Sequence, residues 1–167
     1  AESALPYLSE MLSMGVTTCE VKSGYGLDTQ TELKQLRAVA RLNRMQPIEL
    51  IPTFLGAHAV PAGEDADRYI DDCIAESLPA AAESGLAAFA DIFCEKGVFS
   101  IEQSERYLRR AADLGFRLKV HADEMYPLGG AGLAVHAGAV SADHLLRVRE
   151  EDIAALAASE TVATVLP

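Results

Sequence analysis

Three of the four histidines stand at the ends of short apolar runs, where strands of a parallel sheet would stop. These are His58, His121 and His144, whereas His136 falls inside a predicted helix. A neutral imidazole binds borderline metal ions well and acts as an acid or base near neutral pH. A single histidine is more often a hydrogen-bonded structural residue, but three that converge favour a metal or catalytic site.

Carboxylates lie close to two of these histidines in the sequence. Asp123, Glu124 and Asp143 are candidates to fix an imidazole tautomer or to serve as a base. The pair His121 and Glu124 is a weak signal alone, because a solvated loop beside a core histidine has the same spacing.

Two further residues are candidates for ligand contacts. Tyr25 lies between two glycines, which allow the backbone to approach a ligand and aim a ring with a polar tip, although an ordinary surface turn has the same composition. Glu95 directly follows an apolar run, where it is either buried or a charge at the solvent boundary.

Several familiar catalytic motifs are missing from the sequence. The glycines at 129–132 lack the pattern of a nucleotide-binding loop and predict a helix entry instead. There is no GxSxG, CxxC or HExxH motif, so the sequence lacks the residues that serine acyl-enzymes, thiol redox enzymes and zincin metalloproteases usually require. A metal-dependent hydrolase remains.

The elements that must position these residues alternate between strand and helix along the whole chain. Short runs rich in Val, Ile, Phe and Thr predict six strands, at residues 17–22, 48–55, 89–94, 117–121, 140–144 and 162–166. Between them, capping boxes begin helices at Thr29 and Ser100, and the first of these helices should end near Asn43. Apolar stripes predict further helices after Gly63, Gly130 and Arg149.

Strand and helix alternation fits either a doubly wound open sheet or a (β/α)8 barrel of the TIM type. An open sheet concentrates its chemistry at one switch point, whereas here polar groups follow nearly every predicted strand. A barrel brings all those ends to one mouth, so the barrel is favoured. Because such a barrel usually takes about 200 residues or more, 167 residues predict an incomplete one. The first residues, without Met or a signal-peptide pattern, are typical of a cut into a longer chain.

Composition narrows the class of partner. Acidic residues outnumber Lys and Arg by 25 to 14, which argues against nucleic acid and favours a small molecule. No apolar stretch approaches the roughly 20 residues of a membrane span. Cys19, Cys73 and Cys94 are widely spaced and odd in number, which predicts reduced thiols packed in the core of a cytoplasmic protein.

Taken together, the strand-end residues resemble one family, the imidazolonepropionases. Five blocks in the family's order carry the resemblance across nearly the whole chain: EVKSGYGL at 20–27, FLGAHAVP at 54–61, FCEKGVF at 93–99, VHADE at 120–124 and SADHL at 141–145. The combination is far more specific than any single block.

The resemblance implies an amidohydrolase barrel with one divalent or trivalent metal ion, zinc or iron, which polarises the substrate and activates a water molecule. Water then opens the cyclic amide of 4-imidazolone-5-propanoate to give N-formimidoyl-L-glutamate, a step of histidine degradation. By resemblance, His121 is a metal ligand, Glu124 contacts the ring and serves catalysis, and Tyr25 and His58 bind substrate. His144 lies near the attacking water.

The family's remaining features are expected outside this chain. Residues 1–167 would be the central part of the barrel domain, roughly its second to seventh strands. The first strand with its HxH ligands, the aspartate of the last strand, the arginine for the propanoate and an accessory β-sandwich would lie elsewhere. A homodimer is compatible with the resemblance. The alternatives are another cyclic amidohydrolase, a deaminase of the same superfamily, or a non-catalytic binding or assembly fragment.

Overall fold

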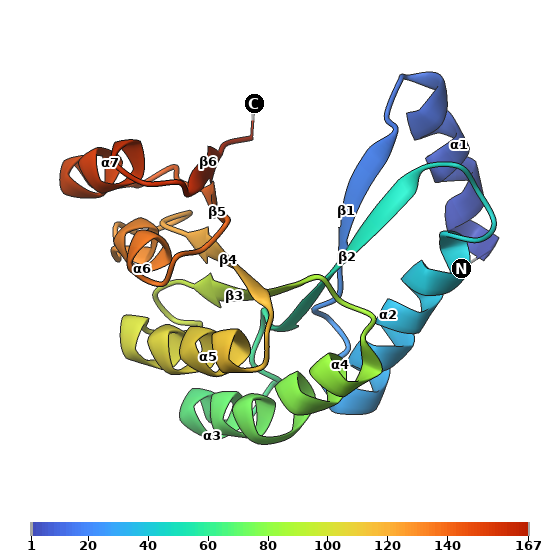
Figure 1. Ribbon diagram of the computed structural model, residues 1–167. Helices are drawn as coiled ribbons and strands as arrows, with labels where there is room; N and C mark the ends of the chain where they lie inside the picture. The colour runs from blue at the N-terminus through green and yellow to red at the C-terminus, as the bar shows by residue number, and fades with distance from the viewer. Residues whose placement is uncertain (1, 167) are drawn as a thin grey trace.

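The computed structural model, which describes residues 2–166, contains one sheet of six parallel strands in consecutive order. The strands are β1 (Thr18–Lys22), β2 (Glu49–Ala57), β3 (Phe89–Cys94), β4 (Arg117–Ala122), β5 (Ser141–His144) and β6 (Val162–Thr164). Each predicted strand is confirmed to within two residues at either end. The sheet curls like the wall of a barrel that stays open on one side (Figure 1), which confirms the predicted α/β fold class.

Helices follow the strands and cover the convex side of the sheet (Figure 1). They are α2 (Thr29–Leu42), α3 (Ala66–Asp72), α4 (Leu78–Ser84), α5 (Ile101–Asp113), α6 (Gly130–His136) and α7 (Glu150–Ala157). A π-helical turn, Cys73–Ser77, joins α3 to α4. One further helix, α1 (Leu5–Ser13), was not predicted; it packs Leu8 against Val39 of α2 and Leu50 of β2.

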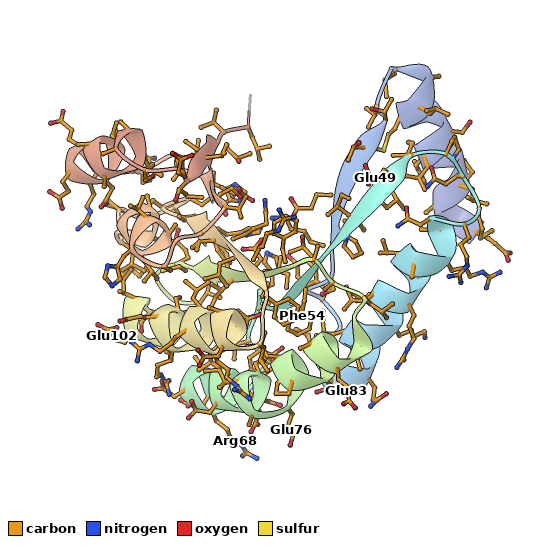
Figure 2. The ribbon with its side chains drawn as sticks, viewed as in Figure 1. Glu49, Phe54, Arg68, Glu76, Glu83 and Glu102 are labelled. Atoms are coloured by element: carbon orange, nitrogen blue, oxygen red, sulfur yellow. The ribbon has the colours of Figure 1, made fainter. Side chains whose placement is uncertain are left out.

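Side chains along each strand alternate between the two faces of the sheet. On the outer face, Phe54, Ile92, Val120 and Ala142 are buried in one apolar core with residues of the helices. In Figure 2, Phe54 lies between β2 and the helices, whereas charged side chains such as Arg68, Glu76 and Glu102 project outward. Polar residues occupy the concave face and bond to one another: Glu20, Lys22, Thr53, Asp91, Lys119, His121, Ser141 and Asp143.

The start of α2 corrects one prediction. The N-cap is Asp28 rather than Thr29, because the Asp28 side chain accepts a hydrogen bond from the Thr31 backbone N–H at 2.8 Å. Glu32 therefore takes no part in a capping box and bonds elsewhere, as described below. The predicted end of the helix near Asn43 is confirmed.

The start of α5 agrees with the sequence. Ser100 accepts from the Gln103 backbone, and the Gln103 side chain accepts from the Ser100 backbone, so both halves of the capping box are present.

Replacing Ser100 by Ala should lower the free energy of unfolding of the full-length protein by about 0.5–2 kcal/mol, because the Gln103 N–H loses its partner. Urea unfolding measures the change. Ser9→Ala is the matched control, since Ser9 is exposed on α1 and makes no capping bond. Equal stability of the Ser100 variant and the control would show that the box contributes nothing.

The cysteines are confirmed as free thiols. Cys73 and Cys94 are buried, and burial raises the pKa of Cys73 to about 12 and that of Cys94 to about 11. Cys19 is only partly buried, at the edge of the smaller apolar cluster beside α1.

Within residues 2–166, none of the helices combines the length and apolar character needed to cross a membrane.

Candidate active site

The structure brings all five residues predicted for the site into one cluster at the C-terminal ends of the strands. The His121 ring centroid lies 5.6 Å from that of His58 and 5.1 Å from that of His144. Tyr25 meets His58 edge-on at 4.8 Å, and Glu124 Oε1 lies 3.7 Å from His144 Nδ1. The predicted convergence is therefore confirmed, while the roles of these residues stay predictions.

Local backbone geometry aims two of these side chains. His144 ends β5 with φ +80°, and Leu145 follows with φ +61°. Non-glycine residues seldom adopt this left-handed region, and such strain concentrates at functional sites because the surrounding structure must hold it. Asp123, directly after β4, has φ +51° and turns the chain between His121 and Glu124.

A buried carboxylate holds the loop that carries Tyr25. Glu32, in the first turn of α2, is 1 % exposed and accepts hydrogen bonds from the backbone N–H of Gly26 at 2.6 Å and of Leu27 at 3.3 Å. A Cβ on Gly26 would lie 2.7 Å from Glu32, so this close approach requires glycine. The Tyr25 ring itself is 74 % exposed.

Glu95 serves the neighbouring loop in a similar way. It is fully buried and accepts from the backbone N–H groups of Lys96 and Met125 at 2.7 and 2.8 Å. Because Met125 follows Glu124 directly, Glu95 anchors the segment that presents Glu124 to the cluster. Glu95 is therefore a support for the site rather than a surface charge.

Asp123 was a candidate base, and the structure gives it a different position. Its buried carboxylate accepts three backbone hydrogen bonds, from Gly129, Gly130 and Ala131 at the start of α6. These bonds confirm that the glycine run is a helix entry. They also occupy Asp123, so it is not the partner of any histidine.

Below the histidines, an ion-pair network crosses the concave face. Lys22 Nζ donates to Asp91 Oδ2 at 2.6 Å and to Asp143 Oδ2 at 2.9 Å. Burial by itself lowers the pKa of Lys22, but the two carboxylates outweigh it and hold that pKa above its usual range. Burial raises the pKa of both Asp91 and Asp143, but their polar neighbours outweigh it and leave both pKa values lowered. These neighbours are His121 and then Lys22 for Asp91, and Lys22 and then Ser141 for Asp143. All three groups are therefore charged at neutral pH.

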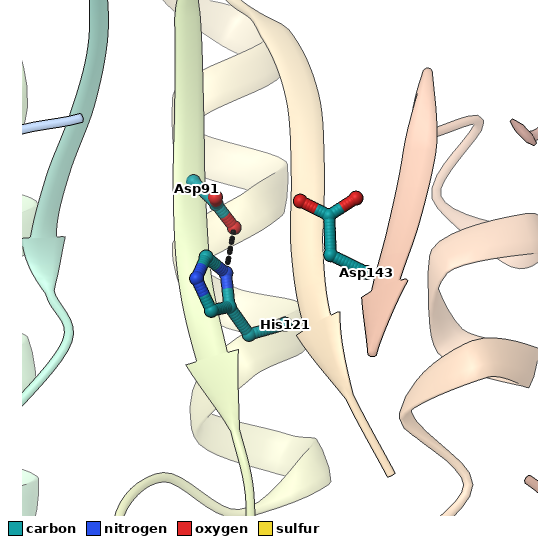
Figure 3. A group of neighbouring side chains, drawn as sticks. All are labelled: Asp91, His121 and Asp143. Carbon is teal, nitrogen blue, oxygen red and sulfur yellow. Dashed lines mark hydrogen bonds and ion pairs between the residues drawn. The ribbon is translucent and has the colours of Figure 1, made fainter. Parts of the chain in front are cut away.

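Asp91 is the carboxylate that the sequence reasoning missed. It is fully buried and its Oδ1 lies 3.1 Å from His121 Nδ1 (Figure 3). The prediction considered residues at strand ends, whereas Asp91 lies in the middle of β3. The available signal was a single acidic residue inside the apolar run Phe89–Cys94, since such charges are rarely buried without a partner.

Asp91, His121 and Asp143 offer one ligand atom each within 4.8 Å of one another, a spacing that could hold a metal ion. Lys22 nevertheless contacts both carboxylates, so its ammonium already occupies the place of a cation between them. Two histidine nitrogens, by contrast, have no hydrogen-bond partner within the described residues. Nε2 of His121 bonds to no group within residues 2–166, and the buried Nδ1 of His58 is without a partner there. This donor chemistry fits a metal and a polar ligand.

Comparison with known proteins identifies similar sequences. The chain is 52 % identical to the imidazolonepropionase of Alkaliphilus metalliredigens over 96 % of its own length and 38 % of the relative's. It is 53 % identical to that of Bacillus velezensis over 99 % of its length and 40 % of the relative's. It is 56 % identical to that of Parabacteroides distasonis over 96 % of its length and 39 % of the relative's. No protein-family model matches.

Solved structures support the fold. An adenine deaminase from Arthrobacter aurescens matches with a TM-score of 0.70 and 22 % identity, covering 96 % of this chain and 50 % of that one. An amidohydrolase from a Sargasso Sea sample matches with a TM-score of 0.62 and 18 % identity, covering 98 % and 42 %. The chain thus has the fold of part of a (β/α) barrel, as in the matched parts of these two proteins. The resemblance to imidazolonepropionases is confirmed over nearly the whole chain, which spans about two fifths of the length of these relatives.

Proposed function

We propose that the full-length protein containing this chain hydrolyses the cyclic amide bond of 4-imidazolone-5-propanoate to N-formimidoyl-L-glutamate, in histidine degradation. The observation that carries the proposal is the 52–56 % identity to imidazolonepropionases over nearly the whole chain. The cluster of Tyr25, His58, His121, Glu124 and His144 supports it, because these residues come from different segments and meet at one end of the sheet.

His121 is the proposed metal ligand of this chain, through Nε2, and the remaining ligands would come from segments outside it. A bound zinc or iron ion would polarise the substrate amide and lower the pKa of a water molecule. An imidazole ligand suits both metals.

Tyr25, His58 and Glu124 are the proposed substrate contacts. Tyr25 and His58 present two rings at right angles, 87° between planes, which suits an edge and a face of a small planar ring. His58 stacks on Phe93 at 5.5 Å, and this packing fixes its orientation. Burial lowers the pKa of His58, as does the neighbouring His121, so it would meet the substrate as a neutral imidazole.

Glu124 and His144 are the proposed groups for proton transfer. At 3.7 Å, Glu124 Oε1 is close enough to His144 Nδ1 to orient it and to exchange a proton through a small movement. Glu124 would accept the proton of the attacking water and deliver it to the ring nitrogen that leaves. His144 would hold the water between them.

The remainder of the proposal concerns the parent protein. Residues 1–167 would form the second to seventh strands of the barrel domain. The first and last strands and the accessory β-sandwich would come from flanking segments. The protein would act in the cytoplasm on a small molecule and water, with no nucleic acid or membrane as partner, and a homodimer is compatible with this arrangement.

Ring opening by the full-length protein is the direct test, followed as loss of imidazolone absorbance. His58→Ala should lower kcat/KM about tenfold to hundredfold, because one hydrogen bond and one ring contact to the substrate are lost. His136→Ala is the matched control, since His136 is exposed on α6 and outside the cluster.

Two outcomes would contradict the proposal. One is release of ammonia from an aminopurine without any ring opening of the imidazolone, which would favour a deaminase. The other is an equal effect of the His58 and His136 substitutions, which would remove the strand-end cluster from substrate binding.

A further inference from the structure

We propose that Asp91 is a positioning residue that fixes His121 with its proton on Nδ1 and so leaves Nε2 free to bind metal. This inference rests on the proposed role of His121 as a metal ligand. Lys22 contributes to this positioning, because its ammonium group holds the Asp91 carboxylate in place.

The direction of the hydrogen bond follows from the charge of Asp91. Its Oδ2 accepts from the Lys22 ammonium at 2.6 Å, a partner that suits a carboxylate, and a carboxylate can only accept. His121 Nδ1, 3.1 Å away, must therefore donate. A neutral imidazole has one N–H, so a proton on Nδ1 leaves the lone pair on Nε2. Figure 3 shows this second nitrogen on the side of the ring turned away from Asp143.

The Asp91 carboxylate has little freedom to move. Oδ1 accepts from His121 and Oδ2 accepts from Lys22 at 2.6 Å, so each oxygen has its own donor. Lys22 is fixed in turn by Asp143, which also accepts from Ser141 at 2.8 Å. Parallel pairing places His121 beside Phe93 and beside Asp143, on neighbouring strands of one sheet. The ring is therefore held by strands rather than by a loop.

Proteins commonly orient a metal-binding histidine in this way. The ring nitrogen that does not bind metal donates to a carboxylate or carbonyl, and loss of that acceptor usually weakens metal binding about 10–100-fold. Here the acceptor is fully buried and charged, which makes the preference for the Nδ1–H tautomer stronger than a backbone carbonyl would.

Asp91→Asn should reverse the tautomer. An asparagine has one acceptor oxygen for two donors, Lys22 and His121. The charged Lys22 ammonium forms the stronger hydrogen bond, so the oxygen would turn toward Lys22. The amide NH₂ would then face His121 Nδ1, which can accept only if the proton moves to Nε2. The nitrogen proposed to bind metal would be blocked, although the shape of the side chain is nearly unchanged.

Asp143→Asn is the matched control. It removes the same charge from Lys22, but Asp143 makes no hydrogen bond to His121, since its second oxygen accepts from Ser141. This control separates the loss of a negative charge from the loss of the acceptor of His121.

The first measurement is the tautomer of His121 in metal-free, full-length protein, from imidazole ¹⁵N chemical shifts above pH 8. Wild type and Asp143→Asn should show the proton on Nδ1. A proton on Nε2 of the wild type, in the other tautomer or in an imidazolium, would overturn the inference. The tautomer of the wild-type protein tests the inference by itself, without an activity assay and without any substituted protein.

The second measurement is the affinity of the same proteins for Zn²⁺, by competition with a chelator. Asp91→Asn should bind about 10–100-fold more weakly, with a far smaller change for Asp143→Asn. The inference would be contradicted if the wild type binds zinc and opens the ring while Asp91→Asn binds zinc with equal affinity. The proposed function would then remain supported. Zinc binding without ring opening would sink the proposed function, while the tautomer still decides the role of Asp91.

Discussion

Replacing His121 by Ala in the full-length protein should remove the metal and reduce ring opening below detection. A catalytic zinc site normally has at least three protein ligands, so the loss of one leaves the ion weakly held. His121 is also the centre of the cluster, with the rings of His58, Phe93 and His144 all within 6 Å of its own. Elemental analysis and kinetics on the same preparation measure the two effects.

Glu124→Gln is the counterpart that separates proton transfer from metal binding. The variant should keep its metal, because Glu124 contacts His144 rather than His121, and kcat should fall about 10²–10⁴-fold with the loss of a general base. Loss of metal in this variant would contradict the roles proposed for both residues. Full metal content in His121→Ala would do the same.

The isolated 167-residue chain should bind little metal, show no measurable ring opening, and associate with itself. One proposed ligand cannot hold the ion or position a water molecule. The described sheet also ends in β1 and β6, whose outer edges pair with nothing in residues 2–166. Unpaired edges readily recruit other chains.

The apolar surface beside β6 adds to this tendency. Val162, Val165 and Leu166 are more than half exposed. Next to them, a cavity of about 390 Å³ is lined by apolar side chains that include Leu145, Ile153 and Leu156. Light scattering after size exclusion, metal analysis and the absorbance assay test the prediction. A stable monomer with one metal ion and normal turnover would refute it.

Much of the fold could be predicted because local patterns decide it. All six strands follow from short β-branched runs, and Ser100 and Gly130 mark helix starts through local chemistry. Helix α1 could have been predicted too, since Leu5, Leu8 and Leu12 have helical spacing. It was overlooked because that stretch was interpreted only as a cut end.

The site was predictable only in part. Residues at strand ends converge whenever parallel strands lie side by side, so the positions of His58, His121 and His144 follow from topology. Lys22, Asp91 and Asp143 are brought together by the curl of the sheet, over as many as 121 positions of sequence. Only the three-dimensional register shows which carboxylate meets which histidine. For that reason Asp123 was chosen as a candidate and Asp91 was not.

The bond between Lys22 and Asp143 also bears on how the sheet assembles. Contacts so distant in sequence pay a large loop-closure entropy, so they form late in folding, after neighbouring strands have paired. A slip of one residue in β1 would turn Lys22 toward the apolar core and leave Asp91 and Asp143 without a counter-charge. The charged network therefore disfavours misregistered sheets, and as a late contact it slows unfolding more than it speeds folding.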